Sequence, residues 1–222
     1  MQSCYIPWKG YFDMMNSVDE FILYDDRQYT KNDWRNRNRI KTPQGLLWLT
    51  IPIARHGIGR RIDEVVTADA AWAAKHWKTL TQFYGRAAHF DAFAGVFEPL
   101  YRTDERRLSV LNRSFLTAVC DVLGIRTPLV DSTAYEVDGE RTQRLVRLCQ
   151  AAGANAYLSG PRARAYLDER LFADAGVQLT YMDYEGYPEY PQLFPPFAHE
   201  VTILDLIFNV GNAAPRFMKS FD

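Results

Sequence analysis

Short apolar runs alternate with longer segments of helical periodicity along this chain, and this alternation limits its fold more than any other feature. Residues 21–24 are apolar and are followed by Asp25 and Asp26, as is typical of a buried parallel strand that ends at a polar edge. Residues 108–123 carry apolar side chains at helical spacing and stop at Gly124. The alternation predicts an α/β fold in which helices flank a mostly parallel sheet.

The individual elements follow from the same patterns. Helices are expected at residues 10–17, 70–84, 108–123, 140–152 and 203–210. Strands are expected at residues 21–24, 46–53, 127–130, 156–158 and 177–181, with residues 2–8 as the tail of a strand and a loop. Loops are expected at residues 29–43 and 181–191. Because 222 residues suit one domain, we expect a single domain. Residues 1–100 would form its core with the ligand-binding loops, and residues 101–222 would continue the α/β fold into a helical C-terminal portion.

Composition excludes several classes of protein. Hydrophobic residues make up 47% of the chain and charged residues 24%, which are values typical of globular proteins. No apolar run approaches the roughly 18–20 residues that span a bilayer, so no integral membrane segment is expected. The N-terminus lacks the pattern of a secretory signal. Cys4, Cys120 and Cys149 form no C-x-x-C pair, so we expect reduced thiols, no metal site and a cytoplasmic location.

Charge is distributed unevenly although the net charge is only −1. Between Arg27 and Arg61 there are nine Lys and Arg residues but a single acid, Asp33. Such a segment indicates either a local anion site or charge that is neutralised across the fold. It does not indicate a nucleic-acid partner, because nucleic-acid-binding domains are usually basic as a whole.

Gly10 lies at the expected start of a helix, where free backbone N–H groups can bind an anion. The segment Trp8-Lys9-Gly10-Tyr11 has the spacing of the H-x-G-H signature of nucleotidylyltransferases, which have a Rossmann-like core. Aromatic residues occupy both histidine positions, and they cannot stabilise phosphate charge as cations. The spacing therefore favours a Rossmann-like, nucleotidylyltransferase-type core more than it favours that reaction. A turn that simply requires glycine is the alternative.

The densest polar segment runs from residue 33 to residue 43. Its cations include Arg37, Arg39 and Lys41, and its amides are Asn36 and Asn38. Guanidinium groups bind phosphate or carboxylate through paired hydrogen bonds, and Asn supplies matched donors and acceptors. We expect a ligand-binding segment here, with a solvated basic loop as the alternative.

Two further positions are candidates for chemistry. His76 lies within the expected helix 70–84 and could act as a general base near neutral pH, although a histidine on an apolar helical face is often a core residue. Ser159 and Gly160 follow an expected strand and could line a ligand pocket. They lack the context of a nucleophile elbow, so a Ser-His-Asp hydrolase is not predicted.

Taken together, several motifs resemble those of the WbqC-like protein family. They are Gln2-Ser3-x-Tyr5-Ile6-Pro7-Trp8-x-Gly10-Tyr11-Phe12, Asp25-x-x-Gln28-Tyr29, Trp34-x-Asn36-Arg37-Asn38-Arg39-Ile40-Lys41-Thr42-Pro43, Trp72-x-x-Lys75-His76, Tyr157-Leu158-Ser159-Gly160 and Tyr184-x-x-Tyr187-x-x-Tyr190-x-Gln192. The resemblance covers nearly the whole chain. It implies a place in O-antigen or other surface-polysaccharide biosynthesis, and a transferase that decorates a sugar with an acyl or aminoacyl group such as glycine.

The expected site is a pocket at the carboxyl ends of the central strands. Arg37, Arg39 and Lys41 would hold the diphosphate of a nucleotide- or lipid-linked sugar, and Asn36 and Asn38 would bind sugar or carboxylate groups. His76 or Asp25 would deprotonate the attacking group, and Tyr5 or Trp8 would stack on a ring. The remaining pocket residues are Gln2, Gly10, Gln28, Ser159 and Gly160.

The expected partner is a small molecule, either an activated sugar or an acyl donor, and the residues indicate no particular cofactor. Two other functions stay open. One is nucleotidyl transfer, which follows from the Rossmann-like and H-x-G-H-like spacing. The other is a sugar- or nucleotide-binding protein of the polysaccharide machinery that has no catalytic activity.

Overall fold

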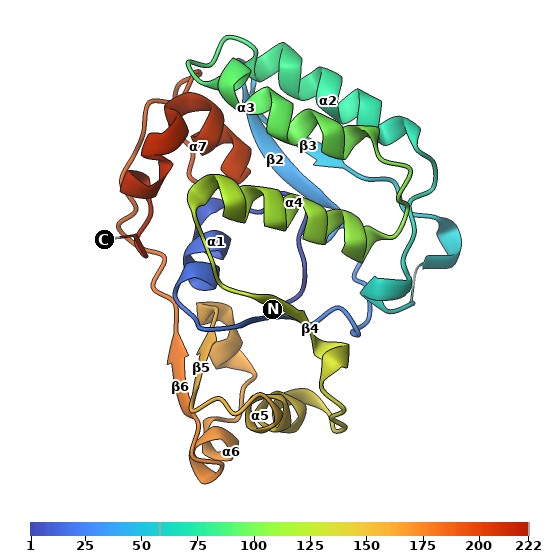
Figure 1. Cartoon of the computed structure of the whole chain (residues 1–222), viewed down its shortest axis with the longest axis vertical. Coiled ribbons are helices and arrows are strands. Elements are labelled where there is room, and N and C mark those ends of the chain that lie inside the picture. The colour runs from blue at the N-terminus through green and yellow to red at the C-terminus, as the bar shows by residue number, and fades with distance from the viewer. Residues whose placement is uncertain (58, 222) are drawn as a thin grey trace.

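The computed structural model describes residues 1–57 and 59–221, which form a mixed α/β fold (Figure 1). Its helices are α1 (Lys9–Asn16), α2 (Ala71–Tyr84), α3 (Phe90–Phe97), α4 (Leu108–Leu123), α5 (Arg141–Ala151), α6 (Glu169–Asp174) and α7 (Ile203–Val210). Its strands are β1 (Phe21–Leu23), β2 (Arg37–Thr42), β3 (Gly45–Thr50), β4 (Leu129–Asp131), β5 (Ala156–Ser159) and β6 (Gln178–Tyr181). The predicted α/β class is confirmed. A helix that could cross a membrane, which needs about 20 apolar residues, is not found in the described part of the chain.

Over the described ranges, the strands form three two-stranded sheets rather than one continuous sheet. β1 pairs in parallel with β4, and Phe21 lies opposite Leu129. β5 pairs in parallel with β6, and Ala156 lies opposite Gln178. β2 and β3 form an antiparallel hairpin. The predicted parallel pairing therefore holds for two of these sheets, and the hairpin is the exception.

The polar segment that we expected to be a loop contains strand β2, so that prediction is wrong for Arg37–Thr42. Charged and amide side chains alternate there, and such a pattern does not resemble a half-buried strand with an apolar face. In the structure Asn38 and Ile40 are buried, whereas Arg37 and Arg39 are only half-buried. Gly45, at a φ of 107°, makes the tight connection to β3.

Helix α4 shows how apolar spacing builds the main core. Leu111, Phe115 and Val119 recur at four-residue spacing and are almost completely buried. The helix ends where Gly124 adopts a φ of 76° and donates its backbone N–H to the Asp121 carbonyl. The predicted boundaries of this helix are confirmed.

A second apolar cluster lies beneath β5 and β6. It is formed by Val146, Cys149, Ala163, Leu167, Phe172 and Val177. Figure 1 shows β5, β6, α5 and α6 at one end of the molecule, and α2, α3 and the β2–β3 hairpin at the other. Helix α1 and the N-terminus lie between these two ends, so the residues that connect the sheets are those of the N-terminal segment.

Two buried carboxylates fasten the chain that follows β6 to the core. Asp13 of α1 accepts hydrogen bonds from the Tyr187 hydroxyl (2.5 Å) and from the backbone N–H groups of Lys219 and Ser220. Asp205 of α7 accepts from the hydroxyls of Tyr84 (2.8 Å) and Tyr190 (2.7 Å). The Tyr187 and Tyr190 bonds hold the aromatic-rich segment, which was expected to be an ordered loop, against α1 and α7, and the Tyr84 bond joins α2 to α7.

Candidate functional site

A cavity of about 1690 Å³ lies where the two parallel sheets approach each other. Its inner cleft is walled by Phe21 and Ile22 of β1 and by Ala156, Tyr157 and Leu158 of β5. Its polar mouth is formed by Trp34, Arg35, Asn38, Arg39 and Glu200. Met1 is hydrogen-bonded to the edge of β1, and Cys4, three residues later, contacts Arg35 of the mouth. The mouth therefore lies beyond the carboxyl end of β1.

The cavity brings together part of the predicted site. The predicted residues that line it are Gln2, Trp8, Asn38, Arg39, Ser159 and Gly160. Among the described residues, those predicted for the site that lie outside its lining are Tyr5, Gly10, Asp25, Gln28, Asn36, Arg37, Lys41 and His76.

Alternating arginine and tryptophan side chains form the outer surface of the mouth. The Arg37 guanidinium lies 4.2 Å from the ring centre of Trp48. The Arg39 guanidinium lies 5.3 Å from Trp48 and 5.4 Å from Trp34, and the two indole rings are 5.3 Å apart. We call these four residues the arginine–tryptophan platform. Both indoles are substantially exposed, so a planar ligand can reach them.

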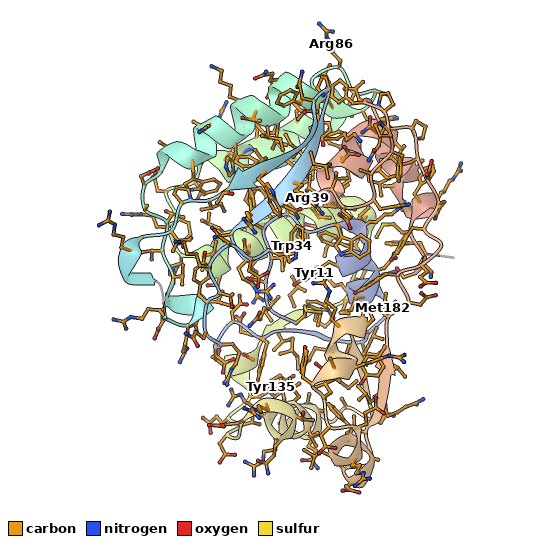
Figure 2. The ribbon with its side chains drawn as sticks, turned by 180° about the vertical axis from the view of Figure 1, so that it is seen from behind. Tyr11, Trp34, Arg39, Arg86, Tyr135 and Met182 are labelled. Atoms are coloured by element: carbon orange, nitrogen blue, oxygen red, sulfur yellow. The ribbon has the colours of Figure 1, made fainter. Side chains whose placement is uncertain are left out.

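Three guanidinium groups near the platform have hydrogen-bonding capacity left over. In the described part of the chain, the buried Nε atoms of Arg35, Arg37 and Arg39 have no hydrogen-bond partner. Arg39 also donates from Nη2 to Glu200 (2.6 Å), and Arg35 donates from Nη1 to the Cys4 sulfur (2.8 Å). Buried donors without acceptors are costly, so these three side chains keep an unmet demand for acceptors. Figure 2 shows Arg39, Trp34 and Tyr11 close together in the middle of the molecule.

Buried amides position the hairpin that carries the platform. Asn36 donates to the Ile51 carbonyl (2.8 Å), and Asn38 donates to the carbonyls of Ile6 (2.7 Å) and Tyr5 (3.2 Å). Ile6 has a φ of 38°, which is rare for a β-branched residue. The two amides therefore hold the hairpin and the N-terminal segment in place, and their binding of sugar or carboxylate groups stays a prediction.

Gly10 provides space for an aromatic ring. A Cβ atom at Gly10 would lie 2.4 Å from the Trp8 ring, so the indole lies directly over this glycine. Tyr184 and Tyr187 pack against the same indole with centroid distances of 5.0 and 5.6 Å. In the other histidine position of the H-x-G-H spacing, Tyr11 donates its hydroxyl to the Gln2 carbonyl (3.0 Å). Both positions are thus occupied by packed, uncharged side chains.

His76 lies in the interior, on the inner face of α2. Its Nδ1 is 2.9 Å from the Tyr5 hydroxyl, which is itself 2.9 Å from the Tyr101 hydroxyl. Burial lowers the pKa of His76 to about 4, although a hydrogen bond with the Thr50 backbone opposes this shift. His76 is therefore neutral at physiological pH and forms part of a buried aromatic network.

The depressed pKa of His76 predicts a stability that falls in mild acid. Between pH 6.5 and pH 4 the unfolded chain binds a proton at His76 and the folded chain does not, so folding loses stability as the pH falls. The loss amounts to about 2 kcal/mol between pH 7 and pH 5. Urea titrations of the wild type and of His76→Gln at both pH values measure it. The variant is expected to lack this component, and an equal acid response in both proteins would contradict the assignment.

The other predicted residues have separate surroundings. Asp25 accepts the backbone N–H of Ser3 (2.8 Å), and burial raises its pKa. Lys41 is buried and donates Nζ to the Pro196 carbonyl. Gln28 is exposed and forms an isolated β-bridge with Arg61. Ser159 and Gly160 are at the carboxyl end of β5, on the cavity wall, as expected for residues that follow a parallel strand.

Four residues at or beside the mouth were missing from the sequence-predicted site: Trp34, Arg35, Trp48 and Glu200. Trp34 stands inside the basic segment, and its position beside several arginines could have identified it. Trp48 faces Arg39 across the hairpin, which the loop prediction concealed. Glu200 reaches Arg39 from 161 residues away along the chain, and no local pattern marks it.

In the described ranges, no three His, Cys, Asp or Glu side chains gather as ligands for a metal ion would. All three cysteines are buried free thiols.

Comparisons with known proteins place the chain among its relatives. A protein of Mycobacterium tuberculosis (strain ATCC 25618 / H37Rv), named Uncharacterized protein Rv1507c, is 49% identical over 221 residues, which are 99% of this chain and 96% of that protein. No solved structure matches the chain. The WbqC-like protein family matches residues 2–217. The chain therefore belongs to the WbqC-like protein family.

Proposed function

We propose that this protein is a transferase that modifies a sugar during surface-polysaccharide biosynthesis, and that it binds an anionic activated sugar at the mouth of the cavity. Family membership supports the setting, since the resemblance to WbqC-like proteins implies O-antigen and related pathways. The observation that carries the proposal is that Arg35 and Arg39 line the cavity mouth together with the exposed indole of Trp34.

This arrangement suits a ligand that has both phosphate and a ring. Guanidinium groups bind phosphate oxygens through charge-assisted hydrogen bonds, and Arg35 and Arg39 both line the cavity. Indole faces stack on sugar or base rings, and Trp34 lines the same cavity. A nucleotide- or lipid-linked sugar with a diphosphate combines these two chemistries, and the size of the cavity accommodates it.

Glu200 is the group best placed to move a proton at the mouth. Its carboxylate lies against Arg39 and its side chain is largely exposed, so a bound phosphate would compete with it for the guanidinium. In the proposed step, an amine or hydroxyl of the sugar attacks the carbonyl carbon of an activated acyl donor. Glu200 takes the proton of the attacking group, and the leaving group of the donor departs with its bonding electron pair.

Arg39→Ala tests the proposed anion site. We expect this variant to bind UDP-sugars roughly 10–100-fold more weakly than the wild type, because it loses charge-assisted hydrogen bonds to phosphate. Isothermal titration with UDP-glucose and UDP-N-acetylglucosamine measures the change. Arg86→Ala is the matched control, since Arg86 is exposed at the far end of the molecule (Figure 2) and should bind as the wild type does. Equal affinities in all three proteins, or no affinity in the wild type, would reject the site.

A binding protein without turnover is the second candidate. The observation that favours it is that His76 and Asp25, the expected bases, both hold interior hydrogen bonds. Glu200→Gln separates the two candidates. The wild type and the variant, each with a bound UDP-sugar, are supplied with acyl and aminoacyl donors, and the rate of turnover is measured. A transferase should lose turnover in this variant and bind the UDP-sugar at least as tightly, because the glutamine no longer competes as a charged group for Arg39, whereas a binding protein shows no turnover in either form.

A further inference from the structure

A second pair of arginines lines the cavity, on a wall that is separate from the arginine–tryptophan platform. Arg141 begins α5 and Arg162 lies in the short 3-10 turn that follows β5, and both line the cavity. Figure 1 shows α5 and β5 at the end of the molecule away from the β2–β3 hairpin, which carries most of the platform. The cavity therefore has cations on two walls that come from different parts of the fold.

The start of α5 is held beside the turn that carries Arg162. Thr142 Oγ1 accepts the backbone N–H of Asp168 (3.1 Å), so the first turn of α5 lies against the segment that follows Arg162. Arg162 lies in the 3-10 turn and Tyr166 ends it, and the side chains of both line the cavity. Arg141, Arg162 and Tyr166 thus belong to one wall, and we call these three residues the second wall.

The second wall is positively charged. In the described part of the chain, neither Arg141 nor Arg162 forms a salt bridge. Glu140 and Asp168 flank the wall in sequence, but neither lines the cavity, and the acids that do line it come from outside residues 141–167. Helix α5 also has no acid in its first turn to offset the positive end of its dipole. The wall therefore attracts an anion.

Tyr166 adds an aromatic surface to this charge. Its side chain is 72% exposed, more than that of any other large hydrophobic residue in the part of the chain that the structure describes. An exposed phenol ring can stack on a planar base, while the neighbouring guanidinium groups bind phosphate oxygens. The second wall thus offers the combination that a nucleotide requires.

The cavity has room for two ligands. Its volume is about 1690 Å³, whereas the pocket of one drug-sized ligand typically measures about 300–1,000 Å³. An activated sugar at the mouth would therefore leave the second wall free. A group-transfer reaction needs its donor and its acceptor side by side, and a cavity with two charged walls can hold both.

We propose that the second wall binds the adenosine-phosphate part of an activated acyl donor, with phosphate on Arg141 and Arg162 and the adenine ring on Tyr166. That this ligand is a donor rests on the proposed function, whereas the pairing of phosphate with a ring rests on the wall itself. Acyl adenylates and coenzyme A thioesters share this chemistry.

The transfer step is the same for both donor classes. The amine or hydroxyl of the sugar forms a bond to the acyl carbon of the donor, and its proton passes to Glu200. The bond from that carbon to the phosphate oxygen of the adenylate, or to the sulfur of coenzyme A, breaks. The leaving phosphate or thiolate keeps the electron pair, so AMP or coenzyme A is the product that remains on the second wall.

Isothermal titration with AMP and with coenzyme A tests this inference without any assumption about the sugar. We expect the wild type to bind at least one of them, and Arg162→Ala and Tyr166→Ala to bind it about tenfold or more weakly. Arg164→Ala is the matched control and should bind as the wild type does. Arg164 is exposed on the same turn but does not line the cavity, and its guanidinium lies over the Tyr181 ring at 4.5 Å.

The two probes and a second ligand separate the outcomes. Tighter binding of AMP supports an acyl adenylate as donor, and tighter binding of coenzyme A supports a thioester. The proposal is overturned if the wild type binds neither probe, if Arg164→Ala weakens binding as much as Arg162→Ala, or if inorganic phosphate binds as tightly as both probes. It is also overturned if Arg162→Ala weakens UDP-glucose binding equally, because the two ligands would then share one site. A wild type that binds AMP or coenzyme A but no UDP-sugar would reject the proposed function and leave the second wall as a nucleotide site.

Discussion

Asp205→Ala is expected to lower the free energy of unfolding by roughly 3–5 kcal/mol, because it removes one acceptor from several buried donors. Asp205 is inaccessible to solvent and accepts hydrogen bonds from the Tyr84 hydroxyl (2.8 Å), the Tyr190 hydroxyl (2.7 Å) and Gln192 Nε2 (2.9 Å). Without the carboxylate these donors stay buried, and the segment around Tyr190 loses its attachment to α7. Urea denaturation followed by circular dichroism measures the change.

Two further variants show whether the effect comes from the network. Asp205→Asn keeps the shape and one oxygen, so we expect a smaller loss. Asp121→Ala removes an exposed acid from α4 and should change stability by no more than about 0.5 kcal/mol. A loss below about 1 kcal/mol for Asp205→Ala would show that the network contributes little to stability.

Gly211→Ala is expected to be comparably destabilising, by roughly 3–5 kcal/mol, for two independent reasons. Gly211 ends α7 with a φ of 58° and a ψ of −134°, a combination that residues with a Cβ rarely adopt. A Cβ atom there would also lie 2.6 Å from Nδ1 of His89, whose backbone N–H is bonded to the Phe208 carbonyl. Because His89 is exposed, its ring would have to turn away from the added Cβ, and the backbone angles of Gly211 carry the larger part of the expected loss. Thermal unfolding measures the loss as a lower melting temperature.

Gly95→Ala is the matched control for Gly211→Ala and should have the opposite sign. Gly95 lies inside α3, and an added Cβ would meet no atom within 4 Å. Alanine is favoured over glycine in a helix interior by about 0.5–1 kcal/mol, so the melting temperature should rise. If both variants destabilised the protein equally, the effect at Gly211 could not be attributed to its backbone angles or to His89.

The helices could be predicted from sequence because their signal is local. The apolar spacing of α2, α4 and α7 reports directly on the face that each one buries. Strand β2 could not be predicted, because its inward side chains include Asn38, whose amide is satisfied by the carbonyls of Tyr5 and Ile6. A polar residue whose hydrogen-bond partners are distant in the sequence is predicted to lie in a loop, because the sequence does not show those partners. Helix α6 has only six residues, so its periodicity is too short to stand out, and helix α3 was not predicted either.

The candidate site was predictable in composition but not in arrangement. The basic segment indicated an anion site, and Arg39 does line the cavity. Which of its neighbours face the ligand depends on strand alternation, which places Arg37 and Arg39 outward and Asn38 inward. Glu200 reaches Arg39 only through the tertiary fold, and the interior position of His76 follows from how α2 packs. Contacts of this kind between remote segments leave no trace in local spacing.

The uncharged anchoring of the β2–β3 hairpin has a consequence for experiments at different ionic strengths. Asn36 and Asn38 hold the hairpin with neutral amides, and such bonds respond little to added electrolyte. Attraction between the guanidinium groups of the mouth and a phosphate is screened as salt rises, with a Debye length of about 10 Å at 0.1 M and about 3 Å at 1 M. A loss of ligand affinity at high salt concentration therefore indicates that the ligand is charged, and does not indicate that the hairpin has unfolded.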